Sequence, residues 1–334
     1  MSKKLLLPLL DILPGSNKKV IDTSSQLPEN ILKMLDQQPK DTVDTLVLSN
    51  GDVWRYFDVT KSIFDHPYLQ NKNVFLQTLG YNNTKISNKC WEISYPIWYW
   101  SRKKSLSQFK AKSVGLKYGV SCLNNKDNYH RIILGYHLYK NNLLDGIIFS
   151  QNIVNDAYSI HRIAQDAEAL NLIDFNEYKK LLPIRYNEPN DPNLNFATDH
   201  SIFHDAYTKA YCNIVTESEC EEYPYEKNIN LPTVTEKSYK PFLAGQVPIM
   251  LAARGHIAYF KSLGFEMMED LLPINYDQMT VLQKINAIIL VILKGNKFIE
   301  DFYFSHLKEI QHNYELVNSD KIEKLMLQNI KNIL

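Results

Sequence analysis

The sequence predicts an α/β protein in two parts with a helical C-terminal tail. The chain has 334 residues, which is enough for two domains of ordinary size or one large α/β domain. Short apolar runs alternate with segments of helical periodicity, as expected for strands of a parallel sheet connected by helices. Beyond Asp277 the helical pattern continues to the end of the chain.

The first part contains three apolar runs separated by turn residues. "LLLPLL" (5–10), "TLVLSNG" (45–51) and "NVFLQTLGY" (73–81) have the length and composition of strands. The first run is interrupted by Pro8 and ends at Asp11, so it is too short for the core of a signal peptide or for a membrane span. We interpret it as a first buried strand of a cytoplasmic protein.

A basic stretch without acidic residues separates the two parts. It follows the aromatic segment "YPIWYW" (95–100), and its cations are Arg102, Lys103, Lys104, Lys110, Lys112 and Lys117. The plain interpretation is a solvated linker, which divides the chain into domains 1–112 and 113–334. The functional interpretation is a platform for an anionic acceptor, such as a phosphorylated or lipid-linked glycan at a membrane surface, or nucleic acid.

The second part opens with a strand, a turn, a helix and a new strand. The strand covers 118–123, the polar turn 124–128, and the helix runs from there to "KNN" at 140–142. A strand then begins at Gly146 or Ile147, which completes the repeating unit of a parallel sheet. The same alternation continues in strands at 211–218, 232–235 and 247–251, and in helices at 236–245 and 255–264.

Composition is typical of a globular protein and argues against a dedicated nucleic-acid binder. Apolar residues make up 45% and charged residues 22%, which is normal for a globular protein, and the formal net charge is zero. A dedicated nucleic-acid binder would usually be basic overall. The cysteines have no metal-binding spacing and are predicted to be reduced thiols: Cys90, Cys122, Cys212 and Cys220.

No metal site is expected. His200 and His204 have the i, i+4 spacing of a helical zinc pair, flanked by Asp199 and Asp205. They lack the glutamate of an H-E-x-x-H pattern and a third ligand nearby. A helix that starts with Asp199 as its N-cap is the better interpretation.

A lysine near the start of a helix raises the first functional question. Thr235 is the predicted N-cap, and Lys237 then lies in the first turn, where it opposes the helix dipole by about 0.3–1 kcal/mol. A bound diphosphate would remove this cost, and Glu236 beside it suits the vicinal hydroxyls of a ribose. Alternatively, Lys237 points into water and pairs with a nearby acid.

The segment "VTEKSYKPFLAGQVPIML" (234–251) resembles the signature of the α1,3-fucosyltransferase family and of related bacterial and viral glycosyltransferases. Upstream, "YCNIVTES" (211–218) and "YGVSCLNNKDNYHRIIL" (118–134) resemble two further family segments, in the same order. The resemblance covers about residues 117–277. It implies a GT-B architecture, in which two Rossmann-like domains face each other across a cleft and the C-terminal one holds the nucleotide-sugar.

The resemblance also implies roles for individual residues. Glu236 would bind the ribose hydroxyls, and Lys237 and Arg131 the diphosphate. Glu217 would lie near the donor sugar or the nucleoside, and Thr235 completes the donor-binding set. The family's tyrosine before the T-E-K triplet is Thr233 in this chain, which leaves the base open between a UDP- and a GDP-linked donor. Tyr223 and Tyr225 in the preceding insert are candidates to replace it.

The implied reaction is a metal-independent, inverting transfer of a sugar to a hydroxyl group. Positive groups on the departing diphosphate would stabilise the transition state, so no cofactor is expected beyond the nucleotide-sugar. The acceptor needs a carboxylate as general base, and the family layout places it in domain 1–112. Glu92, beside the aromatic segment, is preferred over three other acids: Asp52, Asp58 and Asp65.

The acceptor itself is not encoded in a motif. A glycan is the first expectation, and a hydroxylated base of DNA is the alternative that the basic and aromatic stretch supports. A non-catalytic protein that only binds nucleotide-sugars is a third possibility, supported by Thr233 in place of the family's tyrosine. Any membrane contact would be peripheral. The sugar, the linkage and the oligomeric state stay open.

Overall fold

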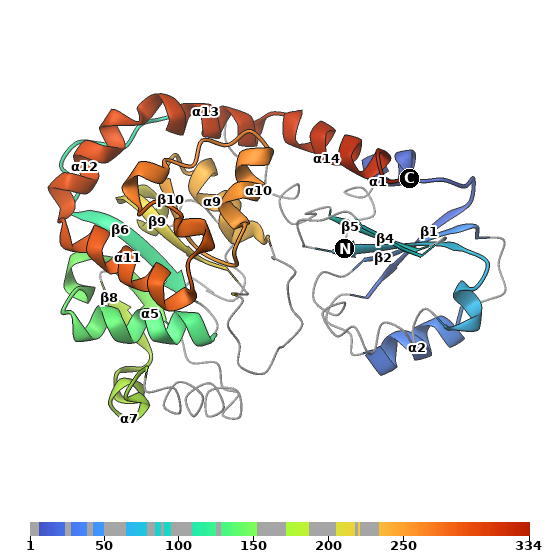
Figure 1. Cartoon of the computed structure of the whole chain (residues 1–334), viewed down its shortest axis with the longest axis horizontal. Coiled ribbons are helices and arrows are strands. Elements are labelled where there is room, and N and C mark those ends of the chain that lie inside the picture. The colour runs from blue at the N-terminus through green and yellow to red at the C-terminus, as the bar shows by residue number, and fades with distance from the viewer. Residues whose placement is uncertain are drawn as a thin grey trace. The chain divides into compact units, whose positions relative to one another are not determined.

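The computed structural model describes residues 7–23, 28–38, 43–49, 65–78, 84–87, 90–94, 109–124, 128–151, 172–186, 205–217, 220 and 234–334. The chain forms two compact units. The N-terminal unit comprises 1–104, 233–235 and 320–334, and the C-terminal unit comprises 105–232 and 236–319. Figure 1 shows both units with their helices and strands, and each is described here by itself.

The N-terminal unit is built on a five-stranded sheet with the order β1-β2-β3-β5-β4. Neighbouring strands are parallel except at the antiparallel β4 edge. The strands are β1 (Lys18–Asp22), β2 (Thr45–Ser49), β3 (Asn73–Thr78), β4 (Thr84–Ser87) and β5 (Cys90–Ser94). The sequence predicted β2 and β3, and both are confirmed.

The first apolar run is a helix and not the predicted strand. It forms α1 (Leu7–Ile12), and the buried Leu9, Leu10 and Leu13 recur at the spacing of one helix face. Pro8 lies in the first turn, where its missing amide hydrogen costs no helical hydrogen bond. A short run of leucines fits either element, and here the helical spacing decided.

Two further helices complete this unit. Helix α2 (Pro28–Asp36) buries Ile31 and Leu35, which lie one turn apart, against the hydrophobic core of the sheet. Helix α14 (Lys321–Lys331) lies against α1 and β5. The last helix of the chain therefore belongs to the same compact unit as the first strands.

The C-terminal unit has a five-stranded sheet with the order β10-β9-β6-β7-β8. All neighbours are parallel except β7 and β8. The strands are β6 (Tyr118–Asn124), β7 (Ile148–Gln151), β8 (Ile184–Tyr186), β9 (Ala210–Thr216) and β10 (Val247–Leu251). Every residue of β9 and β10 is buried, as expected for parallel strands covered on both faces.

Helices connect and cover these strands. They are α5 (Tyr129–Lys140), α7 (Phe175–Tyr178), α8 (Asp205–Thr208), α9 (Glu236–Leu243), α10 (His256–Ser262), α11 (Val281–Leu293), α12 (Asn296–Ser305) and α13 (Leu307–Asn318). The sequence predicted α5, α9, α10 and the helical tail, and all are confirmed. The strand predicted at 232–235 is wrong in its described half, because Val234 and Thr235 are irregular and lead directly into α9.

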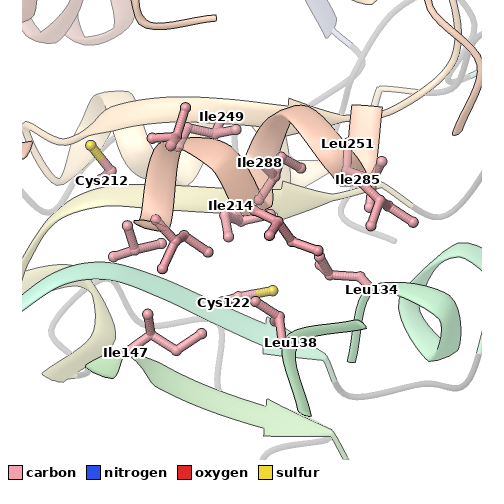
Figure 2. Packing of buried hydrophobic residues seen from close by; sticks show 14 of the residues in the cluster. Cys122, Leu134, Leu138, Ile147, Cys212, Ile214, Ile249, Leu251, Ile285 and Ile288 are labelled. Carbon is pink, nitrogen blue, oxygen red and sulfur yellow. The ribbon is translucent and has the colours of Figure 1, made fainter. Parts of the chain in front are cut away.

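The hydrophobic core of this unit lies between one face of the sheet and the helices α5 and α11. Figure 2 shows side chains from both helices and from the strands meeting in one layer. Leu134 and Leu138 come from α5, and Ile285 and Ile288 from α11. Strand residues Cys122, Cys212, Ile214, Ile249 and Leu251 lie opposite them.

The architecture confirms the α/β prediction: two parallel-rich sheets flanked by helices, in the manner of Rossmann-like units, with a helical C-terminal part. All four cysteines are free thiols, as predicted. Among the described residues, none of the helices is long and apolar enough to cross a membrane.

Candidate functional site

Buried polar side chains gather at the carboxyl edge of the C-terminal sheet. Asn124 ends β6, Thr216 ends β9 and Glu217 follows it. Thr216 donates a hydrogen bond from its hydroxyl to the Asn124 amide oxygen. In open parallel sheets this edge is where ligands bind. We call the buried polar set the carboxyl-edge cluster: Asn124, His130, Arg131, Thr216, Glu217, Ser238 and His256.

Helix α5 supplies two nitrogen-bearing side chains of the cluster. Its first turn follows β6, so His130 and Arg131 reach the end of the neighbouring strand β9. Arg131 donates from Nη2 to the backbone oxygens of Thr216 (2.8 Å) and Glu217 (3.1 Å). His130 donates from Nε2 to the same oxygen of Glu217 at 2.7 Å, because a carbonyl oxygen can only accept.

Burial controls the charge of both groups. It lowers the pKa of Arg131, against which the carboxylates of Glu217 and Glu236 act in the opposite direction. It lowers the pKa of His130 to about 3, with a further contribution from the neighbouring Arg131 charge. Arg131 is therefore the fixed positive charge of the cluster, and His130 is neutral at pH 7.

The carboxylate of Glu217 is held by α9 and, through it, by α10. Ser238 Oγ lies 2.5 Å from Glu217 Oε1 and 2.9 Å from His256 Nε2. The Glu217 amide donates to the backbone oxygen of Leu251 at the end of β10 (3.1 Å). Burial lowers the pKa of His256 to about 4. Ser238 and His256 were not among the predicted site residues.

Glu236 and Lys237 lie in the first turn of α9 and keep part of their surface in solvent. Their exposed side-chain fractions are 17% and 31%, and Lys237 Nζ lies 3.3 Å from Glu236 Oε1. The lysine thus pairs with a nearby acid, the alternative that the sequence left open. Thr235 directly precedes the helix, as predicted.

The first turn of the next helix, α10, is already occupied by a carboxylate. Asp277 accepts hydrogen bonds from the amides of Ile257 (3.0 Å) and Ala258 (3.1 Å). Nearby, the buried Lys284 of α11 donates to the backbone oxygen of Ala252 at 2.8 Å. A single lysine on the apolar face of α11 is the sequence signal that would have pointed to this contact.

The structure brings four predicted site residues to one edge: Arg131, Glu217, Glu236 and Lys237. Glu92 belongs to the other unit, in β5, where its backbone is in register with Leu76 and Thr84. Its side chain lies outside the described part of the structure. Asp65 is exposed in a turn.

Several other predictions fall on residues that the structure does not describe. They are Asp52, Asp58, the aromatic segment 95–100, Asp199, the pair His200 and His204, Tyr223, Tyr225 and Thr233. Among the described side chains, no group of three or more His, Cys, Asp or Glu is arranged to hold a metal ion.

In the described end of the basic stretch, Lys110 and Lys117 are exposed, as expected for a solvated linker, whereas Lys112 is an anchor. Lys112 donates from Nζ to the backbone oxygens of Tyr207 (2.5 Å) and Ala244 (2.8 Å), and its amide donates to the Tyr303 hydroxyl. Burial lowers the pKa of Lys112 to about 8. Lys112 therefore has a structural role, which its position among the other basic residues of the stretch did not indicate.

The fold and the site define an α/β protein with a buried polar cluster, and a partly exposed Glu-Lys pair, at the carboxyl edge of its second sheet. The sequence matches no protein-family model and no curated protein. Among solved structures, it is similar to a trehalose-6-phosphate synthase, OtsA, at 11% identity. The match covers 99% of this chain and 76% of that one, with a TM-score of 0.47.

Proposed function

We propose that this protein is a metal-independent glycosyltransferase whose C-terminal unit binds a nucleotide-sugar. One observation carries the proposal: Glu236 and Lys237, partly exposed at the start of α9, adjoin the buried Arg131 and Glu217 at the carboxyl edge of a parallel sheet. A carboxylate for ribose hydroxyls and a cation for phosphate thus lie side by side. The family resemblance supports the same roles for these residues.

We assign the diphosphate to the first turn of α9 because the first turn of α10 already binds a carboxylate. The first amides of α10 bind the Asp277 carboxylate, which repels a second anion. At α9, Lys237 supplies a partly exposed cation, whose Nζ lies 3.3 Å from Glu236 Oε1. Ribose hydroxyls that donate to Glu236 would leave the Lys237 ammonium for the phosphate oxygens.

The mechanism follows from where charge develops. As the bond from the sugar to the diphosphate breaks, negative charge grows on the leaving phosphate oxygens, and a positioned cation stabilises that state most. Lys237 makes this contact, and Arg131 adds fixed positive charge from inside the edge. Glu217, at the end of β9, contacts the sugar or the nucleoside of the donor.

We assign the acceptor half of the reaction to the predicted domain 1–112 and the donor half to the predicted domain 113–334, although α14 at the end of that range packs within the N-terminal unit. Glu92 is proposed as the base that deprotonates the acceptor hydroxyl, and the transfer inverts the anomeric centre. The acceptor is a glycan in the cytoplasm. This half of the proposal rests on the family resemblance and on the position of Glu92 in β5.

Binding by the purified protein tests the donor site. We expect a higher melting temperature with one of UDP-, GDP- or CMP-sugars, unchanged by EDTA, and slow release of free sugar from that donor. Lys237→Ala should abolish the shift. Lys261→Ala is the matched control, because Lys261 is an exposed lysine of the same unit that pairs with Glu269. Equal shifts in both variants, or none in the unmodified protein, would contradict the proposal.

A further inference from the structure

The carboxylate of Glu217 is held by a chain of two hydrogen bonds that starts at a buried histidine. His256 Nε2 lies 2.9 Å from Ser238 Oγ, which lies 2.5 Å from Glu217 Oε1. All three residues are at most 1% exposed. They come from the ends of three different elements, α10, α9 and β9.

The hydrogen atoms of these two hydrogen bonds have only one consistent arrangement. A carboxylate only accepts, so the single hydroxyl hydrogen of Ser238 points to Glu217. His256 must then donate from Nε2 to the serine oxygen. Because burial lowers the pKa of His256 to about 4, the ring is neutral at pH 7 and carries its one hydrogen on Nε2.

The backbone of Glu217 is fixed as firmly as its side chain. Its carbonyl oxygen accepts from Arg131 and His130, and its amide donates to Leu251 of β10. The backbone thus stays in place, and the hydrogen bond from Ser238 restrains the rotation of the carboxylate. Ser238 directly follows Lys237 in the chain.

We infer that Ser238 and His256 are positioning residues that hold the Glu217 carboxylate toward the sugar of the donor, the first of the two contacts proposed for it, and link its orientation to the phosphate-binding turn of α9. The inference rests on the proposed function. Neither residue touches the substrate: His256 orients Ser238, and Ser238 orients Glu217. A diphosphate that moves Lys237 also moves Ser238, the next residue. Phosphate binding therefore changes the orientation of the Glu217 carboxylate through its hydrogen bond with Ser238.

The tautomer of His256 tests the proton order without any ligand. Long-range ¹H–¹⁵N spectra of histidine-labelled protein at pH 7 should show a protonated Nε2 and a bare Nδ1 for His256, assigned by loss of its signals in His256→Gln. The opposite tautomer would make Nε2 an acceptor and overturn the inference. This result is independent of whether the protein binds nucleotide-sugars.

Donor binding tests the positioning role. Ser238→Ala should weaken binding of the nucleotide-sugar about tenfold and binding of the matching nucleoside diphosphate less than twofold, since only the former includes the sugar. His256→Gln keeps a donor near the Nε2 position and should retain most of the affinity, whereas His256→Ala should resemble Ser238→Ala.

Ser121→Ala is the matched control, because Ser121 is an equally buried hydroxyl of the same unit that accepts from Asn213. The role would be structural, and the inference wrong, if Ser121→Ala lowered the affinity for the nucleotide-sugar as much as Ser238→Ala does. The same holds if Ser238→Ala lowered the affinities for the nucleotide-sugar and the nucleoside diphosphate equally. If the unmodified protein bound no nucleotide-sugar, the proposed function would fail, and the positioning role with it, whereas the His256 tautomer would still decide the proton order.

Discussion

Lys237 and Glu236, neighbours in the first turn of α9, form an ion pair at 3.3 Å. A lysine at the start of a helix opposes the helix dipole, and an adjacent carboxylate offsets that cost. The pair is partly exposed, so it contributes little to stability, and each member has a ligand group that suits it. Each residue can therefore be substituted alone, and its effect on ligand binding can be measured with little loss of stability.

Glu236→Gln should separate ribose binding from folding. We expect about a tenfold loss of affinity for the preferred nucleotide-sugar, because an amide accepts hydrogen bonds from vicinal hydroxyls less strongly than a carboxylate. The free energy of unfolding should change by less than about 1 kcal/mol. Isothermal titration calorimetry and urea unfolding measure the two effects. An unchanged affinity would remove Glu236 from the donor site.

Gly135, in the middle of α5, should not tolerate a methyl group. A Cβ atom there would lie 2.0 Å from the Tyr178 hydroxyl and 2.5 Å from Gln151 Oε1. Gly135→Ala should therefore lower the free energy of unfolding by about 1–3 kcal/mol, although alanine favours helices. Tyr178→Phe removes the nearest atom, so the double variant should lose less than the sum. Stabilisation by Gly135→Ala would show that α5 does not approach α7 this closely.

Asp277 should act as the cap of α10. Asp277→Ala removes the acceptor of two helix amides, and we expect a loss of about 0.5–2 kcal/mol in the free energy of unfolding. Asp301→Ala is the control, since Asp301 is an exposed acid whose ion pair with Lys297 is worth little. Equal losses in the two variants, measured by urea unfolding, would contradict the capping role.

Stability should fall on acidification below about pH 6.5. Burial lowers the pKa of His256 to about 4 and of His130 to about 3 in the folded state, while the unfolded chain protonates both near 6.5. The stabilisation is therefore complete above pH 6.5 and is lost as the pH falls toward these folded values. Each histidine contributes up to about 1.4 kcal/mol per pH unit in that range.

The variant His256→Gln isolates one of these two contributions. Its unfolding free energy should depend less steeply on pH between 6.5 and about 4 than that of the unmodified protein. Urea unfolding at several pH values gives both slopes. Identical slopes would mean that His256 titrates in the folded state as it does in water.

Local pattern was enough for most central elements. The strands β6, β9 and β10 and the helices α5, α9 and α10 follow directly from apolar runs and helical periodicity. The first run failed because six residues of leucine and proline satisfy both a strand and one face of a short helix. The strand predicted at 232–235 failed in its described half, where Val234 and Thr235 are irregular and lead directly into α9.

The site was predictable only where a residue's type and local position revealed its chemistry. Lys237 was predicted as a site residue because a cation is unusual at a helix start, and Glu236 was predicted because it is adjacent. Ser238 and His256 look ordinary in the sequence, since a serine in a helix and a histidine after a glycine occur everywhere. Lys112 looked like one of six linker cations, although it binds two carbonyl oxygens.

The sequence by itself determined strands β6, β7, β9 and β10 and helices α5, α9 and α10 of the C-terminal unit, since turns and periodicity act over a few residues. Only the tertiary structure decided that Arg131 meets Glu217, which is 86 residues away, and that Ser238 lies between Glu217 and His256. Those contacts depend on β9 pairing between β6 and β10. Burial of whole strand faces, and not any local signal, sets that pairing.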